Sequence, residues 1–397
     1  MNAEDAPSKK NNPIRFARNV VVKAGLLFVI INLLFGVTNP LPFLGRMSLY
    51  NHLFPGRQRL PYGDEPQRSF NLSLFQLDAM FASTKLAAGP KPDDEYRVII
   101  IGDSATWGFL LPPDQTLAAW INAGNYTLND GRRLRAYNLG YPVMSLAKDL
   151  LILSYAIHYQ PDMIVWPFTL ESFPYDKQLY PPLLQHNSQF VRQLIQDYAL
   201  PLNPDDPQLL TPSFWDRTLV GSRRELADLV HLQLYGVMWA ATGIDQYIPE
   251  TYTPRMEDLP DDLSFHNLNP PHLQASDLAL PILQAGLNMA GSTPVLLFNE
   301  PMFISQGKNS DIRYNFYYPR WAYDDFRLIM QEQSQQFGWN YEDDWNVVSA
   351  SEFTNSAVHM TPKGEATFAK LVAKKIITTA NQYQTGKFLG EDIMTEP

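Results

Sequence analysis

The sequence predicts an α/β protein whose parallel sheet is covered by helices on both faces, with a transmembrane helix ahead of it. Between residues 95 and 380, short apolar runs typical of buried strands alternate with longer segments of helical periodicity. Residues 19–38 form an apolar stretch of about the length that crosses a bilayer. With 397 residues, 45% of them hydrophobic, the chain can build a sizeable core without covalent cross-links.

Individual elements follow from this alternation. Strands are expected at residues 97–101, 135–139, 163–168, 294–298 and 345–348. Helices are expected near residues 117–122, 145–159 and 324–337. Ser145 is a candidate N-cap for the second of these, and Thr361-Pro362 predicts the start of a last helix, because an N-cap residue precedes a first-turn proline there.

The N-terminal stretch predicts a membrane anchor. All five Lys/Arg residues of the first 38 positions lie before residues 19–38 or near their start, which predicts a cytoplasmic tail (1–18) and an extracytoplasmic body. A cleaved signal peptide is the rival interpretation, but no small-x-small cleavage site follows the stretch. A buried core helix is the simplest alternative.

The remainder divides into a neck or linker (39–94), the α/β domain (95–380) and a loose polar tail (381–397). An insertion rich in proline and aromatic residues (171–290) interrupts the domain, with helix-like pieces near 189–198 and 223–238. Long insertions of this kind serve as lids or partner docks, although a purely structural excursion is an equally good interpretation.

Composition excludes several classes of function. Residues 1–38 carry a net charge of +3 and the whole chain −10, which leaves −13 on residues 39–397 and argues against nucleic-acid binding. The chain has no cysteine, so it has neither disulfides nor thiolate metal sites, and its histidines show no metal-ligand spacing. No phosphate-binding loop or dinucleotide motif is present, so no cofactor is expected.

The most informative segment is the strand that ends in Gly102-Asp103-Ser104. The carboxyl edge of a parallel sheet is where ligands bind, so a serine delivered there is a candidate nucleophile, with its own N–H available for an oxyanion. An ordinary strand-to-loop turn is the alternative, because Gly, Asp and Ser are common turn residues. His359 is the candidate general base, since it lies in the loop that leads into the last helix.

These segments together resemble the SGNH/GDSL hydrolase family. Gly102, Asp103 and Ser104 match its first block, Gly140 its second and His359 its last. The resemblance covers residues 96–170 and 293–380 and implies a three-layer, flavodoxin-like α/β fold. It also implies that Ser104 attacks an acyl carbonyl, that His359 accepts the serine proton, and that the N–H groups of Ser104 and Gly140 form the oxyanion hole.

Two positions depart from the family pattern. Glu171 takes the place of the oxyanion-hole asparagine; a charged carboxylate there repels an oxyanion, whereas a buried neutral acid donates a hydrogen bond. Ser356 takes the place of the aspartate that orients the histidine, with Asn355 beside it as the other candidate. Glu300, which leaves the fourth strand at the same edge, is expected to be a surface acid rather than a pocket residue.

The resemblance implies an anchored, extracytoplasmic ester hydrolase or O-acyltransferase that acts on cell-envelope glycan or lipid, with a membrane O-acyltransferase as a possible partner. The replacements at Glu171 and Ser356 favour a second interpretation. In that interpretation the fold is catalytically weak or inactive and binds a glycan or an assembly partner. A secreted soluble esterase is a third.

Overall fold

The computed structural model describes residues 13–384 except 49, 50, 52, 53, 55, 64, 66, 67 and 69–71. Its centre is a five-stranded parallel sheet with the order β2-β1-β3-β4-β5, which is the flavodoxin-like arrangement. The predicted α/β class is confirmed. The strands are β1 (Glu95–Ile100), β2 (Arg133–Asn138), β3 (Met163–Phe168), β4 (Val295–Asn299) and β5 (Asn340–Asp343).

Helices cover both faces of the sheet, because alternate strand residues point to opposite sides and are apolar on each. One buried cluster lies under α6 (Leu117–Ala123) and α13 (Pro362–Gln384). The other lies under α7 (Leu146–Ala156), α11 (Leu280–Ala290) and α12 (Arg320–Phe337).

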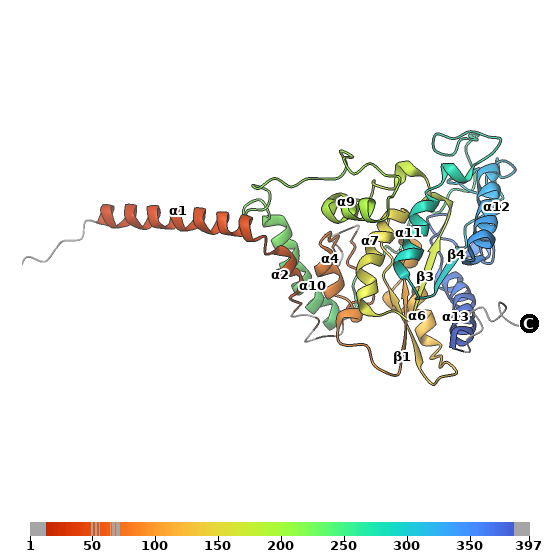
Figure 1. Cartoon of the computed structure of the whole chain (residues 1–397), viewed down its shortest axis with the longest axis horizontal. Helices are drawn as coiled ribbons and strands as arrows, with labels where there is room; N and C mark the ends of the chain where they lie inside the picture. The colour runs from red at the N-terminus through yellow and green to blue at the C-terminus, as the bar shows by residue number, and fades with distance from the viewer. Residues whose placement is uncertain are drawn as a thin grey trace, which may run out of the picture.

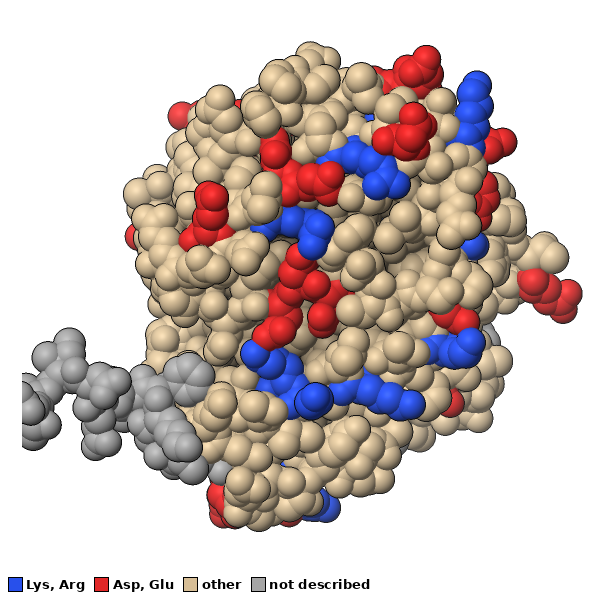
Figure 2. Space-filling view, turned by 90° about the vertical axis from the view of Figure 1, so that its right-hand side faces the viewer, with Lys and Arg blue, Asp and Glu red and all other residues tan. Residues whose placement is uncertain are grey.

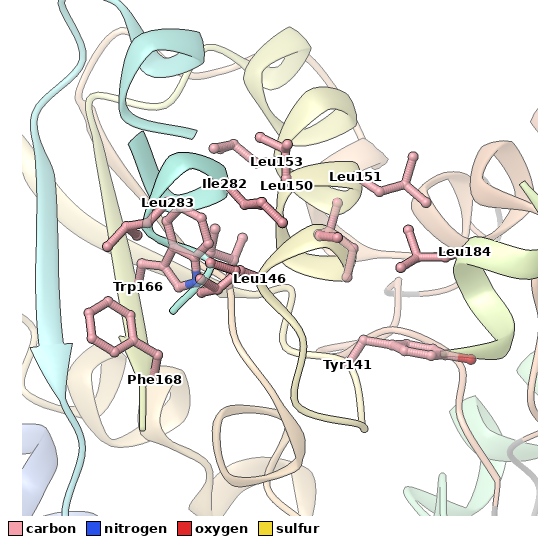
Figure 3. Close-up of a cluster of buried hydrophobic side chains, with 14 of the residues drawn as sticks. Tyr141, Leu146, Leu150, Leu151, Leu153, Trp166, Phe168, Leu184, Ile282 and Leu283 are labelled. Atoms are coloured by element: carbon pink, nitrogen blue, oxygen red, sulfur yellow. The ribbon is translucent and has the colours of Figure 1, made fainter. Parts of the chain in front are cut away.

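Trp166 on β3 is central to the second cluster, beside Leu146 of α7 and Leu283 of α11 (Figure 3). Gly286 allows this close approach, because a Cβ at that position would lie 2.5 Å from the Trp166 ring.

The strand prediction is wrong at one position. The fifth strand is Asn340–Asp343, whereas residues 345–348 were expected. β5 is an edge strand of half-buried polar residues, so it lacks the apolar run that marks the central strands. Trp345 instead packs in a loop against Tyr314 and Tyr323, at ring-centroid distances of 5.1 and 5.9 Å.

The capping predictions agree with the structure. The Ser145 hydroxyl accepts a hydrogen bond from the Lys148 N–H at 3.1 Å, and the Thr361 hydroxyl accepts one from the Gly364 N–H at 3.2 Å. These caps fix where α7 and α13 begin.

Among the described residues, one helix is long and apolar enough to cross a membrane. This is α1 (Pro13–Thr38), whose most apolar 18-residue stretch has a mean hydropathy of 2.5, and it projects away from the body (Figure 1). It starts inside the basic segment that we expected to belong to the tail. Residues 1–12 and most of the expected C-terminal tail (385–397) lie outside the described residues.

The neck contains α2 (Leu41–Arg46), α4 (Leu77–Ala82) and the short helix η1 (Lys85–Ala87), and its apolar side chains join the main core. Arg59 is fully buried in this segment. Its guanidinium donates to both carboxylate oxygens of Asp245, at 2.9 and 3.0 Å, and to the Gly108 carbonyl at 2.9 Å. It also lies 4.0 Å from the centre of the Trp107 ring. Arg59 therefore connects the neck, the insertion and the segment after β1.

The segment between β3 and β4 contains three helices ahead of the crossover helix α11. They are α8 (Pro182–His186), α9 (Ser188–Asp197) and α10 (Arg223–Thr242). α9 and α10 correspond to the two helix-like pieces expected there. α10 lies beside the neck and the end of α1 (Figure 1). Short helical turns complete the chain: α5 (Ser104–Trp107), η2 (Pro113–Gln115), η3 (Ile157–Tyr159), η4 (Leu170–Ser172), η5 (Tyr175–Lys177), η6 (Ala275–Asp277) and η7 (Ala350–Glu352).

Candidate active site

The turn after β1 presents Ser104 at the carboxyl edge of the sheet. Gly102 has a φ of 151°, and a Cβ there would lie 2.4 Å from the Thr106 hydroxyl, so only glycine fits this approach. The Asp103 carboxylate accepts a hydrogen bond from the Ala105 N–H at 2.7 Å, which starts α5 at Ser104. No acceptor binds the Ser104 N–H among the residues that the structure describes.

Ser104 and His359 meet at this edge although 255 positions separate them in the chain. The Ser104 Oγ lies 2.8 Å from His359 Nε2, and His359 Nδ1 lies 2.8 Å from Asn355 Oδ1. An amide oxygen only accepts hydrogen bonds, so Nδ1 carries the proton and Nε2 is free to accept the serine proton. This is the geometry that a general base requires.

A tight turn holds the histidine against Asn355. Phe353 and Met360 form an antiparallel bridge, and the Thr354 N–H donates to the His359 carbonyl at 2.8 Å. The Phe109 ring stacks on the imidazole at a centroid distance of 4.7 Å. Burial lowers the pKa of His359 to about 3, so the ring is neutral over the physiological range.

Of the two residues that the sequence offered to orient His359, the structure brings Asn355 into contact and not Ser356. Ser356 is buried and hydrogen-bonds to Tyr317 instead. Asn355 is one position further from His359 along the chain than Ser356. Which of the two reaches the imidazole depends on the geometry of this turn, and the sequence does not show that geometry.

Gly140 lies against the nucleophile turn, but its N–H is engaged. A Cβ there would lie 2.5 Å from the Trp107 backbone nitrogen, so glycine is required by this contact. The Gly140 N–H donates to Asn138 Oδ1 at 3.0 Å and not toward open space. The N–H groups of Ser104 and Gly140 were expected to form the oxyanion hole. In this geometry the Ser104 N–H is available to an oxyanion, whereas the Gly140 N–H is not.

Glu171 is buried after β3 and contacts two basic side chains. Its carboxylate lies 3.0 Å from Lys177 Nζ and 3.2 Å from His266 Nε2. Burial opposes charge on His266, but hydrogen bonds with Glu171 and Asp176 outweigh this effect and raise the pKa of His266. Both Glu171 carboxylate oxygens are therefore engaged by side chains of the insertion, one by Lys177 and the other by His266.

A buried lysine beneath the turn was missed from the sequence. Lys148 of α7 is fully buried, and its Nζ donates to the carbonyls of Gly102 and Tyr141 at 2.7 and 2.6 Å. It also pairs with Asp149 at 2.7 Å. Lys148 thereby joins the turn after β1 to the loop after β2. The signal was present, because Lys148 and Asp149 are the charged residues of an otherwise apolar helix.

Glu300 was expected to be a surface acid, but that expectation is wrong, because only 2% of its surface is exposed. It lies against Asp103, and the Asp103 Oδ2 and Glu300 Oε1 atoms have no hydrogen-bond partner in the described part of the chain. Burial raises the pKa of Asp103 to about 6 and that of Glu300 well above its usual value. Burial therefore favours a proton shared by these two carboxyls beneath Ser104.

The described residues contain no cluster of three or more His, Asp or Glu side chains that could hold a metal ion. A cavity of about 670 Å³ opens at the outer edge of β2, and its lining includes Lys85, Asn122 and Arg135 but neither Ser104 nor His359. The Ser104–His359 pair thus lies outside that cavity.

Comparison with known proteins gives structural likenesses only. No family model and no curated protein matches the chain. A Desulfitobacterium hafniense protein named as a lipolytic member of the G-D-S-L family is 11% identical, covering 71% of this chain and 99% of its own, with a TM-score of 0.31. A Sinorhizobium meliloti carbohydrate acetylesterase family member is 8% identical over 72% and 98%, with a TM-score of 0.31. A mutant acetylxylan esterase from Geobacillus stearothermophilus is 10% identical over 71% and 94%, with a TM-score of 0.34.

Proposed function

We propose that this protein is a membrane-anchored, extracytoplasmic SGNH-like serine enzyme. It would hydrolyse or transfer O-acyl groups on cell-envelope glycan or lipid. The observation that carries the proposal is the contact between Ser104 Oγ and His359 Nε2, extended by the hydrogen bond from Nδ1 to Asn355. The ordered sequence blocks around Ser104, Gly140 and His359 support the same assignment.

In this proposal Ser104 Oγ attacks the acyl carbonyl while its proton passes to His359 Nε2. The imidazolium returns that proton to the leaving oxygen, and an acyl-serine remains. Water or a sugar hydroxyl then attacks the acyl-serine, with Nε2 taking its proton and giving it back to Ser104. The Ser104 N–H stabilises the oxyanion in both steps, and the Gly140 N–H joins it once it releases Asn138 Oδ1.

The electrostatics of the relay favour a slow enzyme. Asn355 holds the ring in the required tautomer but supplies no negative charge to stabilise an imidazolium. A Cys-His-Asn relay shows that an amide is sufficient for orientation. The low pKa of His359 nevertheless makes it a weak base, because general-base catalysis is most efficient when the pKa lies near the working pH.

The location follows from α1 and the charge distribution. Basic residues precede the apolar part of α1, which supports a cytoplasmic N-terminus and an extracytoplasmic catalytic body. An anchored acyl-transfer enzyme suits a substrate of the envelope, and a membrane O-acyltransferase is a candidate source of its acyl groups.

Labelling with a fluorophosphonate probe tests the proposal. The wild-type protein should be labelled, the Ser104→Ala variant should not, and Ser351→Ala, which removes an exposed serine, should behave as the wild type. Absence of labelling in well-folded wild-type protein overturns the enzyme assignment. That outcome favours the rival function, in which an inactive fold binds a glycan or an assembly partner. The ion-paired Glu171 also supports this rival function.

A further inference from the structure

We propose that α10 and the loop before it (residues 214–220) form a bilayer-contact surface that lies in the outer boundary of the membrane. The surface consists of Trp215, Val220, Val230, Leu234, Val237 and Met238. The inference rests on the proposed anchoring by α1, and it adds a second membrane attachment that fixes how the body is oriented.

The first observation is an apolar face of α10 that no other described segment covers. Trp215 is 69% exposed and Leu234 is 56% exposed. The exposed apolar residues of α10 recur at positions 230, 234 and 237, which is one face of a helix. The opposite face packs on the body through Leu232, Gly236 and Trp239. A helix with apolar residues on two faces requires an apolar environment on the side that the protein leaves open.

The second observation is direct contact between this loop and the candidate span. The Asn32 side chain of α1 accepts a hydrogen bond from the Val220 N–H at 3.0 Å, and a Cβ on Gly36 would lie 3.1 Å from the Phe214 ring. Asn32 precedes the end of α1 by six residues, which is about 9 Å along a helix. Amphipathic helices in the interface sink about 5–10 Å into the boundary, so the loop lies at the matching depth.

The arrangement in space agrees with this depth. α1 points away from the body, and α10 runs across its inner end (Figure 1). If α1 follows the membrane normal, α10 lies along the membrane plane. The face of the body farthest from α1 carries charged side chains of both signs (Figure 2), which is typical of a surface in water.

Charge does not drive the contact. The charged residues of the loop and the first turns of α10 cancel: Arg217, Arg223 and Arg224 against Asp216, Glu225 and Asp228. Attachment by α10 should therefore depend on apolar burial and be insensitive to salt and to anionic lipid.

Site-directed fluorescence on the full-length protein tests the proposal, and the absence of native cysteines allows single-site labelling. The label is an environment-sensitive fluorophore on Leu234→Cys. Leu328→Cys on α12 is the matched control, because Leu328 is 57% exposed on a helix far from α1. Phe28→Cys reports α1 itself. Each protein is reconstituted in phosphatidylcholine vesicles with and without lipids that carry a quenching nitroxide on the acyl chain.

We expect nitroxide lipids to reduce the fluorescence at Leu234→Cys and Phe28→Cys at least twofold, with no change at Leu328→Cys and no effect of 0.5 M salt. Quenching at Phe28→Cys without quenching at Leu234→Cys overturns the surface and leaves the anchor intact. No quenching at Phe28→Cys overturns the anchor. A label on Leu234→Cys that is shielded from aqueous iodide but not quenched by lipid assigns the face to a protein partner and also overturns the proposal.

Discussion

The two layers of the candidate site differ in charge. The reacting layer contains Ser104, His359 and Asn355, and all three are neutral and partly exposed to solvent. The layer beneath it contains Lys148, Asp149 and the Asp103–Glu300 pair, which are ionisable and almost fully buried. In a Ser-His-Asp triad the negative charge touches the histidine. Here the buried charges hold the backbone of the turn that carries Ser104, and among the described residues His359 hydrogen-bonds to the uncharged Asn355 and Ser104.

The largest effect should come from removing the base. His359→Ala should lower the rate of fluorophosphonate labelling about 10²–10⁴-fold, because Ser104 then loses its proton acceptor. His158→Ala, which removes an exposed histidine, is the control and should leave the rate unchanged. Equal labelling of wild type and His359→Ala contradicts a role for the reacting layer.

The next effect concerns the buried layer. Lys148→Met should lower the free energy of unfolding by about 3–5 kcal/mol, because the buried Asp149 loses its ion-pair partner and the carbonyls of Gly102 and Tyr141 lose their donor. Chemical denaturation in detergent measures this change. Lys370→Met, on the exposed side of α13, should change it by less than about 0.5 kcal/mol. Similar values for the two variants mean that the buried lysine does not hold the turn.

A smaller effect should follow from restoring a charge to the reacting layer. Asn355→Asp places a carboxylate beside Nδ1, so the pKa of His359 should rise from its low value and the labelling rate at pH 7 should increase about tenfold. The acid limb of the pH–rate profile should move to higher pH. Asn355→Ala is the control and should lower the rate without that shift. An unchanged profile in Asn355→Asp rules out the charge argument.

The smallest effect concerns the shared proton. The raised pKa values of Asp103 and Glu300 mean that the folded protein holds more protons than the unfolded chain, so stability falls as the pH rises through about 6 and above. Glu300→Gln keeps a donor toward Asp103 and should be more stable than the wild type by about 1 kcal/mol at pH 8.5, and equal to it at pH 4.5. Glu332→Gln, an exposed change on α12, should show no such pH dependence.

The sequence was informative where a pattern is local. The β-branched run before Gly102 and the cap at Thr361-Pro362 predicted the strand end and the helix start that bring Ser104 and His359 to one edge. It failed where the outcome depends on packing between distant segments. β5 has no apolar run because it lies at the sheet edge. Glu300 is buried against Asp103, which lies almost 200 positions earlier in the chain. The choice of Asn355 over Ser356 depends on one turn and could not be read from residue types.

Arg59 has a consequence for how such a protein would meet its substrate. Its buried contacts join the neck to Gly108, four residues after Ser104, and to Asp245, three residues after α10 ends. In the proposed anchored enzyme, these contacts hold Ser104 at a fixed height above the membrane. Such an enzyme reaches only acyl acceptors that lie at that height, and it meets them by lateral diffusion along the membrane.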